Sequence, residues 1–290
     1  MKRLFNSLLG SSFISGIGNS LVGVPFSITL GFYFTKRRHL VIALSTAVIG
    51  LGMFIASPVA LYFLENLSLD ETFLAIGALN IHLCIIGFIC RPSAQEKHIH
   101  AAYKRTHIKH DDSKSNHKKI RKLFRYFLLS CNFRTLSNIP FLLFLLSTLT
   151  WNVMLSICLL HLPNYASVLG ASDFEITLLM TCFSVSNTSG RFLSALTVVK
   201  SGFDIVALHI LSLGILGVVT VTYPFYSVYD VTKCSYVFAV TSGLLTGAPN
   251  SLMTPITLDM VGLDNLSAAH GLEFFFAGIG FLAGPPIAGL

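Results

Sequence analysis

Arg191 is the residue whose type and surroundings suggest chemistry most directly. It is the only charged residue between Ile176 and Val199, in a run of apolar and small residues long enough to cross a membrane. Inserting a guanidinium at that depth costs about 3 kcal/mol, and intramembrane charges usually face a partner, a cavity or a ligand. Arg191 therefore either snorkels toward the lipid headgroups or meets an anion that passes through the membrane. The second possibility predicts an anion-binding site.

His270 and Glu273 form a second candidate site. They are three residues apart near the predicted cytoplasmic end of the last apolar stretch, so a helix would bring them together and they could titrate as a pair. A carboxylate that stabilises the start of a helix explains Glu273 equally well. Elsewhere the sequence offers no nucleophile with a base, no paired carboxylates and no phosphate loop. It therefore predicts no enzyme, no cofactor and no metal site.

The composition is that of an integral membrane protein. Of the 290 residues, 53% are hydrophobic and 11% are charged, and the mean hydropathy is +0.72, which ordinary soluble domains do not reach. A helix of about 20 apolar residues crosses the hydrocarbon core of a bilayer. Eight such spans are predicted, namely Leu8–Phe32, Leu40–Phe63, Phe73–Cys90, Pro140–Leu160, Ile176–Val199, Ile205–Phe225, Tyr236–Leu258 and Ala268–Leu290.

Basic residues are concentrated in alternate loops, and this sets the predicted orientation. Residues 91–134 hold twelve Lys or Arg against three acidic residues, and Lys36, Arg37 and Arg38 follow the first predicted span. By the positive-inside rule these loops are cytoplasmic. Lys36, Arg37 and Arg38 could in addition latch an inward-facing gate. Because topology explains the basicity, the expected surroundings are the lipid bilayer, and no nucleic-acid partner is predicted.

Two loop segments carry further expectations. Asn66-Leu67-Ser68 is a glycosylation sequon in a loop predicted to be extracellular, which makes Asn66 a candidate acceptor. Residues 118–134 place apolar side chains at helical spacing among basic ones, as in an interfacial helix on an anionic membrane surface. A disordered basic tether is an equally good interpretation of that segment.

Four stretches of the sequence match motifs of one family of membrane proteins. Tyr33-Phe34-Thr35-Lys36-Arg37-Arg38, followed by Leu40, resembles the signature Y-F-x-K-R-R-x-L at the start of the family's fifth helix. Cys90-Arg91-Pro92 is similar to the end of its sixth helix, and Leu162-Pro163-Asn164-Tyr165-Ala166 to its extracellular loop between helices seven and eight. Residues 259–290 are similar to its helix ten to eleven region. The four similarities occur in the family's order, and the sequence therefore resembles the monocarboxylate transporter family.

The resemblance implies a major facilitator fold, an all-α membrane architecture of twelve helices in two bundles of six. The eight predicted spans would correspond to family helices four to eleven. Residues 1–90 would form the second half of the N-terminal bundle with three spans, and residues 91–135 the basic cytoplasmic loop. Residues 136–290 would form the C-terminal bundle with five spans. The expected architecture is thus a partial major facilitator fold.

The resemblance also implies roles for individual residues. Arg191 falls where the family has an arginine on helix eight that is expected to bind the substrate carboxylate, which a guanidinium can hold in bidentate fashion. Proton-coupled members have an aspartate one turn earlier, where this chain has Asn187, a residue that cannot change charge. Proton coupling through this helix is therefore not predicted. Asn250 could line the same cavity or pack against a neighbouring helix.

These inferences predict a multi-pass plasma-membrane transporter that moves a small organic anion, such as a short monocarboxylate, by alternating access. By the same resemblance, a single-span accessory glycoprotein could accompany it. Two alternatives remain open. One is a fragment or partial gene product that does not transport, and the other is a facilitator for a neutral or zwitterionic solute.

Overall fold

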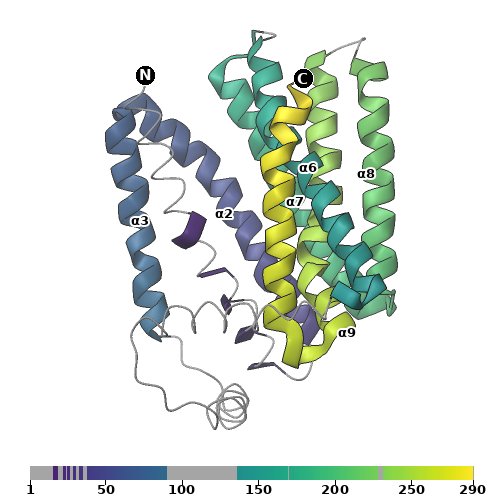
Figure 1. The fold of residues 1–290 in the computed structure, drawn as a ribbon. Coiled ribbons are helices and arrows are strands. Elements are labelled where there is room, and N and C mark those ends of the chain that lie inside the picture. Colours follow the sequence, from purple (N-terminus) through teal and green to yellow (C-terminus); the bar gives the residue numbers. More distant parts are fainter. Residues whose placement is uncertain are drawn as a thin grey trace, which may run out of the picture.

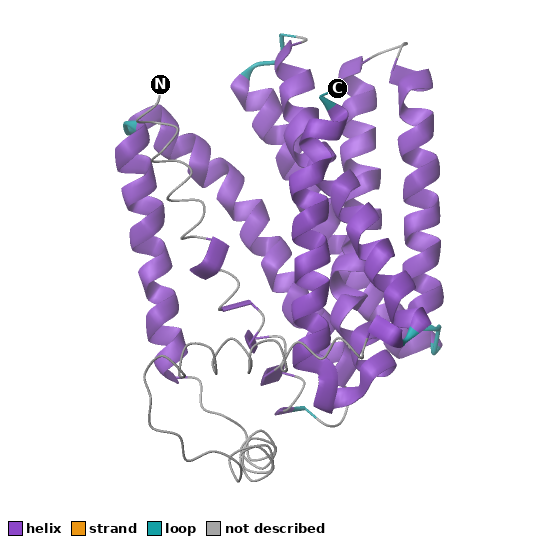
Figure 2. Ribbon diagram, viewed as in Figure 1, coloured by secondary structure: helices purple, strands orange, loops and turns teal. Residues whose placement is uncertain are grey.

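The computed structural model describes residues 16–18, 22–23, 25–26, 29–30, 33–34, 38–89, 136–168, 170–227 and 231–289. All long elements in these ranges are helices (Figure 2). They are α2 (Arg38–Asn66), α3 (Leu69–Ile89), α6 (Ile139–Val168), α7 (Asp173–Ser201), α8 (Ile205–Ser227) and α9 (Val231–Ala288). The all-α prediction is confirmed for this part of the chain, whereas the predicted span Leu8–Phe32 lies largely outside the described residues.

Successive helices run in opposite directions (Figure 1). The helices α2 and α3 form a hairpin, and α6 to α9 form a bundle against which α2 packs through α7 and α9. The element α9 contains two segments that meet at Gly262, whose φ of 74° and ψ of 172° are open to glycine because it lacks a Cβ. The second segment turns back along the bundle (Figure 1). The first segment contains the predicted span Tyr236–Leu258, and the second contains the predicted span Ala268–Leu290 as far as Ala288, where α9 ends.

Four helical stretches among the described residues are long and apolar enough to cross a membrane. They are Leu40–Asn66, Ile139–Val168, Ile205–Tyr226 and Asn265–Ala288. The other predicted spans that the structure describes are also helical, within α3, α7 and the first segment of α9. The helix α7 is less apolar because it carries Arg191, Asn187 and several hydroxyl side chains.

The polar side chains of α7 lie on its buried face. Ser184, Asn187, Thr188, Arg191 and Ser194 are all buried, and their spacing of three or four residues places them on one side of the helix. The opposite side exposes large apolar residues, for example Leu193 and Leu196. A membrane helix with this pattern turns its apolar side to lipid and its polar side to the protein interior. This orientation is what brings Arg191 into the bundle.

Glycines bring helix backbones close together beside this polar face. A methyl group added to Gly247 would lie 2.6 Å from both the Arg191 nitrogen and the Asn187 oxygen of the α7 backbone. On the second segment of α9, a methyl group added to Gly284 would lie 2.7 Å from the Val153 carbonyl oxygen of α6. No Cβ atom fits at such distances, so both glycines are sites of close helix contact, as small residues commonly are in membranes.

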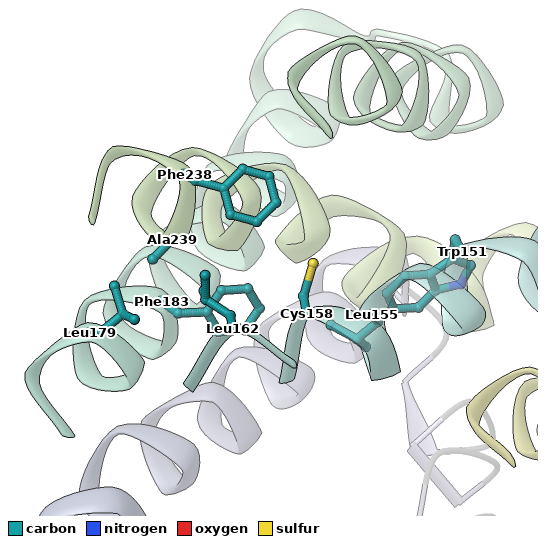
Figure 3. Packing of buried hydrophobic residues seen from close by; sticks show 8 residues of the cluster. All are labelled: Trp151, Leu155, Cys158, Leu162, Leu179, Phe183, Phe238 and Ala239. Atoms are coloured by element: carbon teal, nitrogen blue, oxygen red, sulfur yellow. The ribbon is translucent and has the colours of Figure 1, made fainter. Parts of the chain in front are cut away.

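Two apolar clusters fill the space between the helices. One joins α6, α7 and the first segment of α9 through eight buried residues (Figure 3): Trp151, Leu155, Cys158, Leu162, Leu179, Phe183, Phe238 and Ala239. The second lies between α6 and both segments of α9 and consists of Phe141, Phe144, Leu145, Ala248, Leu252, Ile256 and Ala269. The first cluster packs α6 and α7 against the first segment of α9, and the second packs α6 against both segments of α9.

The loops near Asn66 and Leu162 are shorter than the sequence predicted. The stretch Leu162–Ala166 belongs to α6, which ends at Val168 with Pro163 inside it, so these residues are not in a loop. The next helix begins after Ser172, whose side chain accepts from the Glu175 backbone while the Glu175 carboxylate accepts from the Ser172 backbone. This capping box fixes the start of α7. Asn66 is the last residue of α2 rather than a loop residue.

Candidate functional site

Arg191 reaches across the bundle from α7 to α2. Its side chain is 5% exposed, and Nη1 donates a hydrogen bond of 2.8 Å to the backbone carbonyl oxygen of Thr46. Because the guanidinium meets a neighbouring helix in the protein interior, it does not snorkel along α7 to the headgroups. The two helices are close here, since an added methyl group on Gly50 of α2 would lie 3.1 Å from the Thr188 Cα atom of α7.

Asn187 holds the guanidinium from the same helix. Arg191 Nε donates to Asn187 Oδ1 over 2.8 Å, and Asn187 Nδ2 donates to the Thr246 hydroxyl over 2.9 Å and to the Gly243 carbonyl over 3.4 Å. The spacing of four residues allows the first contact, and the close packing of α9 allows the other two. The amide oxygen and the amide nitrogen of Asn187 therefore both form hydrogen bonds. Asn187 orients Arg191 and links it to α9.

In the described part of the chain, the positive charge of Arg191 has only neutral hydrogen-bond partners. Among the described residues, its acceptors are the Asn187 side chain and the Thr46 carbonyl, and neither carries a formal charge. Within the same residues it forms no ion pair, and Nη2 donates to no acceptor. A buried charge without a counter-charge is unfavourable. An anionic ligand would supply a negative charge and accept hydrogen bonds from the remaining N–H groups of the guanidinium.

Asn250 does not contact Arg191. It lies half-buried on α9 and donates to the Thr246 carbonyl of its own helix over 3.0 Å. Among the described residues, hydrogen bonds link Asn250 to the arginine indirectly, through Thr246 and Asn187. This bond within α9 tests neither packing against a neighbouring helix nor contact with substrate, and both remain predictions.

Residues that sequence reasoning did not select complete the surroundings of Arg191. Thr46 contributes a backbone carbonyl, which no side-chain pattern reveals. Thr246 follows Gly243 by three residues, and its hydroxyl could have been found only if α7 and α9 were known to touch. Ser194 and Ser251 also join these helices, with their hydroxyl oxygens 2.6 Å apart.

The structure brings His270 and Glu273 together, as their spacing predicts. His270 Nδ1 lies 2.6 Å from Glu273 Oε2, and the Thr257 hydroxyl donates to Glu273 Oε1. Their side chains are buried, with residue exposures of 1% and 0%. The alternative of a carboxylate at a helix start at the interface does not fit a fully buried residue that lies inside the second segment of α9.

The other sequence candidates lie away from both sites or outside the described residues. Lys36 and Arg37 are outside them, and Arg38 is the first residue of α2, with a side chain that is not described. Asn66 donates to the Tyr62 carbonyl over 2.8 Å, and Ser68 of the same sequon caps α3 by bonding Glu71. The roles of Lys36, Arg37, Arg38 and Asn66 remain predictions.

Comparison with known proteins agrees with the fold. The chain is 27% identical over 293 residues to Monocarboxylate transporter 12 of Xenopus laevis, covering 95% of this chain and 60% of that protein. It is 25% identical to Monocarboxylate transporter 12 of Homo sapiens, covering 100% of this chain and 57% of that protein. It is also 25% identical to Monocarboxylate transporter 2 of Meriones unguiculatus, covering 96% of this chain and 57% of that protein.

This chain therefore spans about three fifths of the length of these relatives. A sequence model of the Major Facilitator Superfamily matches residues 2–285, nearly the whole chain. Together with the helical membrane architecture, and with relatives that are named monocarboxylate transporters, this match establishes that the chain belongs to the Major Facilitator Superfamily.

Proposed function

We propose that this chain provides the anion-binding part of a plasma-membrane transporter for small organic anions, with Arg191 as the residue that binds the substrate carboxylate. The observation that carries the proposal is a buried guanidinium with only neutral acceptors among the described residues. A short monocarboxylate matches this site because its two oxygens can accept from a guanidinium in parallel. The names of the relatives add support for this class of substrate.

The position of Arg191 suggests how binding would affect the helices. Nη1 is occupied by the Thr46 carbonyl of α2, in the segment that sequence analysis assigns to the N-terminal bundle. A carboxylate that binds both terminal nitrogens would compete with this carbonyl and so weaken the link between α2 and α7. Alternating access requires such links between the two halves to form and break around the substrate.

Proton coupling is not part of the proposal for α7. Asn187 occupies the position that bonds Arg191 Nε, and an amide carries no charge in either its free or its bonded state. The charge of the arginine site therefore stays fixed when pH changes. A transport cycle that uses this site alone would follow the anion gradient and the membrane potential.

Anion binding to the purified chain in lipid nanodiscs tests the site. We expect sodium propionate to bind and its neutral isostere propionamide to bind far more weakly, as measured by calorimetric titration. Arg191→Gln should weaken propionate binding by about 10- to 100-fold, because hydrogen bonds to charged groups contribute about 1.5–3 kcal/mol. Ser189→Ala is the matched control, since Ser189 lies on the exposed side of the same helix and should leave binding unchanged.

The outcomes separate the competing functions. Equal binding of propionate by the wild type and by Arg191→Gln would reject Arg191 as the anion site. Tighter binding of propionamide or of a zwitterion such as alanine would favour a facilitator for neutral solutes. Propionate binding without labelled propionate uptake by cells that express the chain at their surface would support the site and count against transport by these 290 residues. Retention in internal membranes would contradict the proposed location.

A further inference from the structure

Three buried side chains connect the two segments of α9. Thr257 lies on the first segment, and His270 and Glu273 lie on the second, beyond the turn at Gly262. His270 Nδ1 and the Thr257 hydroxyl each contact one oxygen of the Glu273 carboxyl group. Both carboxyl oxygens of Glu273 thus have a hydrogen-bond partner, and the bond to Thr257 connects the two segments across the turn at Gly262.

No positive charge balances Glu273 in the described part of the chain. Its only charged or titratable partner there is His270. Several other titratable side chains, on α9 itself and on the elements that pack against it, have different partners or surroundings. Arg191 donates hydrogen bonds to Asn187 and Thr46. Of the histidines, His161 contacts the Pro285 carbonyl and His209 contacts Ser147. Cys158 lies in the apolar cluster of Figure 3, and Asp259 and Glu65 are exposed.

The number of protons on the pair sets its net charge. With a carboxylate and a neutral imidazole, the cluster carries one negative charge in the protein interior. One added proton makes it neutral overall. Because an unbalanced buried charge is strongly disfavoured, the neutral cluster is the more stable form inside the protein.

The environment of His270 indicates which group holds this proton. His270 Nε2 is buried and has no hydrogen-bond partner among the described residues, and the ring packs edge-on against Phe274. If the proton were on the imidazole, a charged N–H at Nε2 would be left without an acceptor, which costs more than a neutral unpaired N–H. A protonated Glu273 that donates to Nδ1 keeps both groups neutral.

We propose that Thr257, His270 and Glu273 form a binding site for one proton, which the Glu273 carboxyl group carries and shares with His270 Nδ1. Binding converts a carboxylate and one proton from water into a carboxylic acid, and release reverses this step. The Thr257 hydroxyl has one hydrogen but two acceptors, the Met253 carbonyl at 3.0 Å and Glu273. Proton release strengthens its bond to Glu273, so the contact between the two α9 segments changes with protonation.

Infrared difference spectroscopy of the chain in lipid nanodiscs tests the site directly. At neutral pH we expect the carbonyl stretch of a protonated carboxylic acid, which shifts in deuterium oxide and is lost when the pH is raised. Glu273→Gln should remove this band, and His270→Gln and Thr257→Val should each shift its frequency and the midpoint of its loss. Size-exclusion chromatography and circular dichroism establish that each variant is folded.

The exposed residue Glu175 provides the matched control. Its hydrogen bonds from Ser172 lower the pKa of its carboxyl group, so it is ionised at neutral pH and Glu175→Gln should leave the band unchanged. A wild-type spectrum without a protonated carboxyl band at neutral pH would overturn the proposal, and so would a band that persists in Glu273→Gln. The experiment requires no substrate, so its result is independent of whether Arg191 binds anions.

Discussion

The two polar sites of this protein differ in whether their charge can change. Around Arg191, a fixed positive charge is held by an amide and a backbone carbonyl on two helices. Around Glu273, an imidazole and a hydroxyl hold a carboxyl group whose charge depends on a proton. Both ionisable groups are buried, and neither has a permanent opposite charge beside it among the described residues. The first can be neutralised only by an anion, and the second by a proton.

The difference between the sites follows from single residues. Asn187 beside Arg191 cannot titrate, whereas His270 and Glu273 are two titratable groups on one turn of the second α9 segment. If both proposals hold, substrate charge and proton charge are bound on separate helices, α7 and α9. In the described part of the chain, α7 contacts the first segment of α9 closely beside Gly243 and Gly247, and this contact lies next to the arginine site. A substitution at that contact can therefore test whether the arginine site changes while the Glu273 site stays intact.

The largest expected effect is that of Gly247→Ala. The added methyl group would lie 2.6 Å from α7 backbone atoms of Arg191 and Asn187, so the helices must separate. We expect destabilisation of about 1–3 kcal/mol, as for other overpacked positions, together with weaker propionate binding. Denaturation in detergent and calorimetric titration measure the two effects. The infrared band of Glu273 should remain, because its partners lie elsewhere on α9.

Gly278→Ala is the control for this substitution. Gly278 also lies in α9, but a methyl group there meets no atom within 4 Å. It should be neutral or slightly stabilising, because alanine favours helix more than glycine does. Equal stability and equal propionate affinity of the two variants would show that the close approach at Gly247 does not hold the arginine site together.

A smaller effect is expected from Asn187→Asp, which would give the arginine site a proton-dependent charge like that of the α9 site. The new carboxylate would replace the amide oxygen 2.8 Å from Arg191 Nε and compete with a bound anion. We expect propionate affinity to fall about tenfold at neutral pH, equivalent to about 1.4 kcal/mol. The affinity should recover in acid, as the aspartate gains a proton. Calorimetric titration at several pH values measures this, and pH-independent binding by the variant would contradict it.

Much of the fold follows from the sequence, whereas the contacts of the site do not. Apolar length predicts the helices, and Arg191 and the pair His270 and Glu273 stand out because charges are rare in apolar stretches. The Thr46 carbonyl cannot be found in this way, since every residue has one and only the packing of α2 on α7 selects it. The contact of Thr257 with Glu273 likewise depends on the turn at Gly262. Local patterns identify the charged groups, and tertiary packing identifies their partners.

The smallest effect is expected at the start of α7, where Glu175 offers an exposed contrast to Glu273. It lies just outside the predicted span 176–199, and hydrogen bonds from the Ser172 backbone and hydroxyl lower the pKa of its carboxyl group below 4.5. A lowered folded-state pKa means that the stabilisation is present above the unfolded-state pKa and is lost as the pH falls through the folded-state value. Thermal unfolding should therefore show the wild type more stable than Glu175→Gln at neutral pH, with the difference shrinking only in acid below about pH 4.5.

Ser172→Ala should lower stability by about 1 kcal/mol, as the loss of other N-cap side chains does. A difference between wild type and Glu175→Gln that instead disappears near neutral pH would mean that this exposed carboxyl group holds a proton there, and the contrast with the buried site on α9 would be lost.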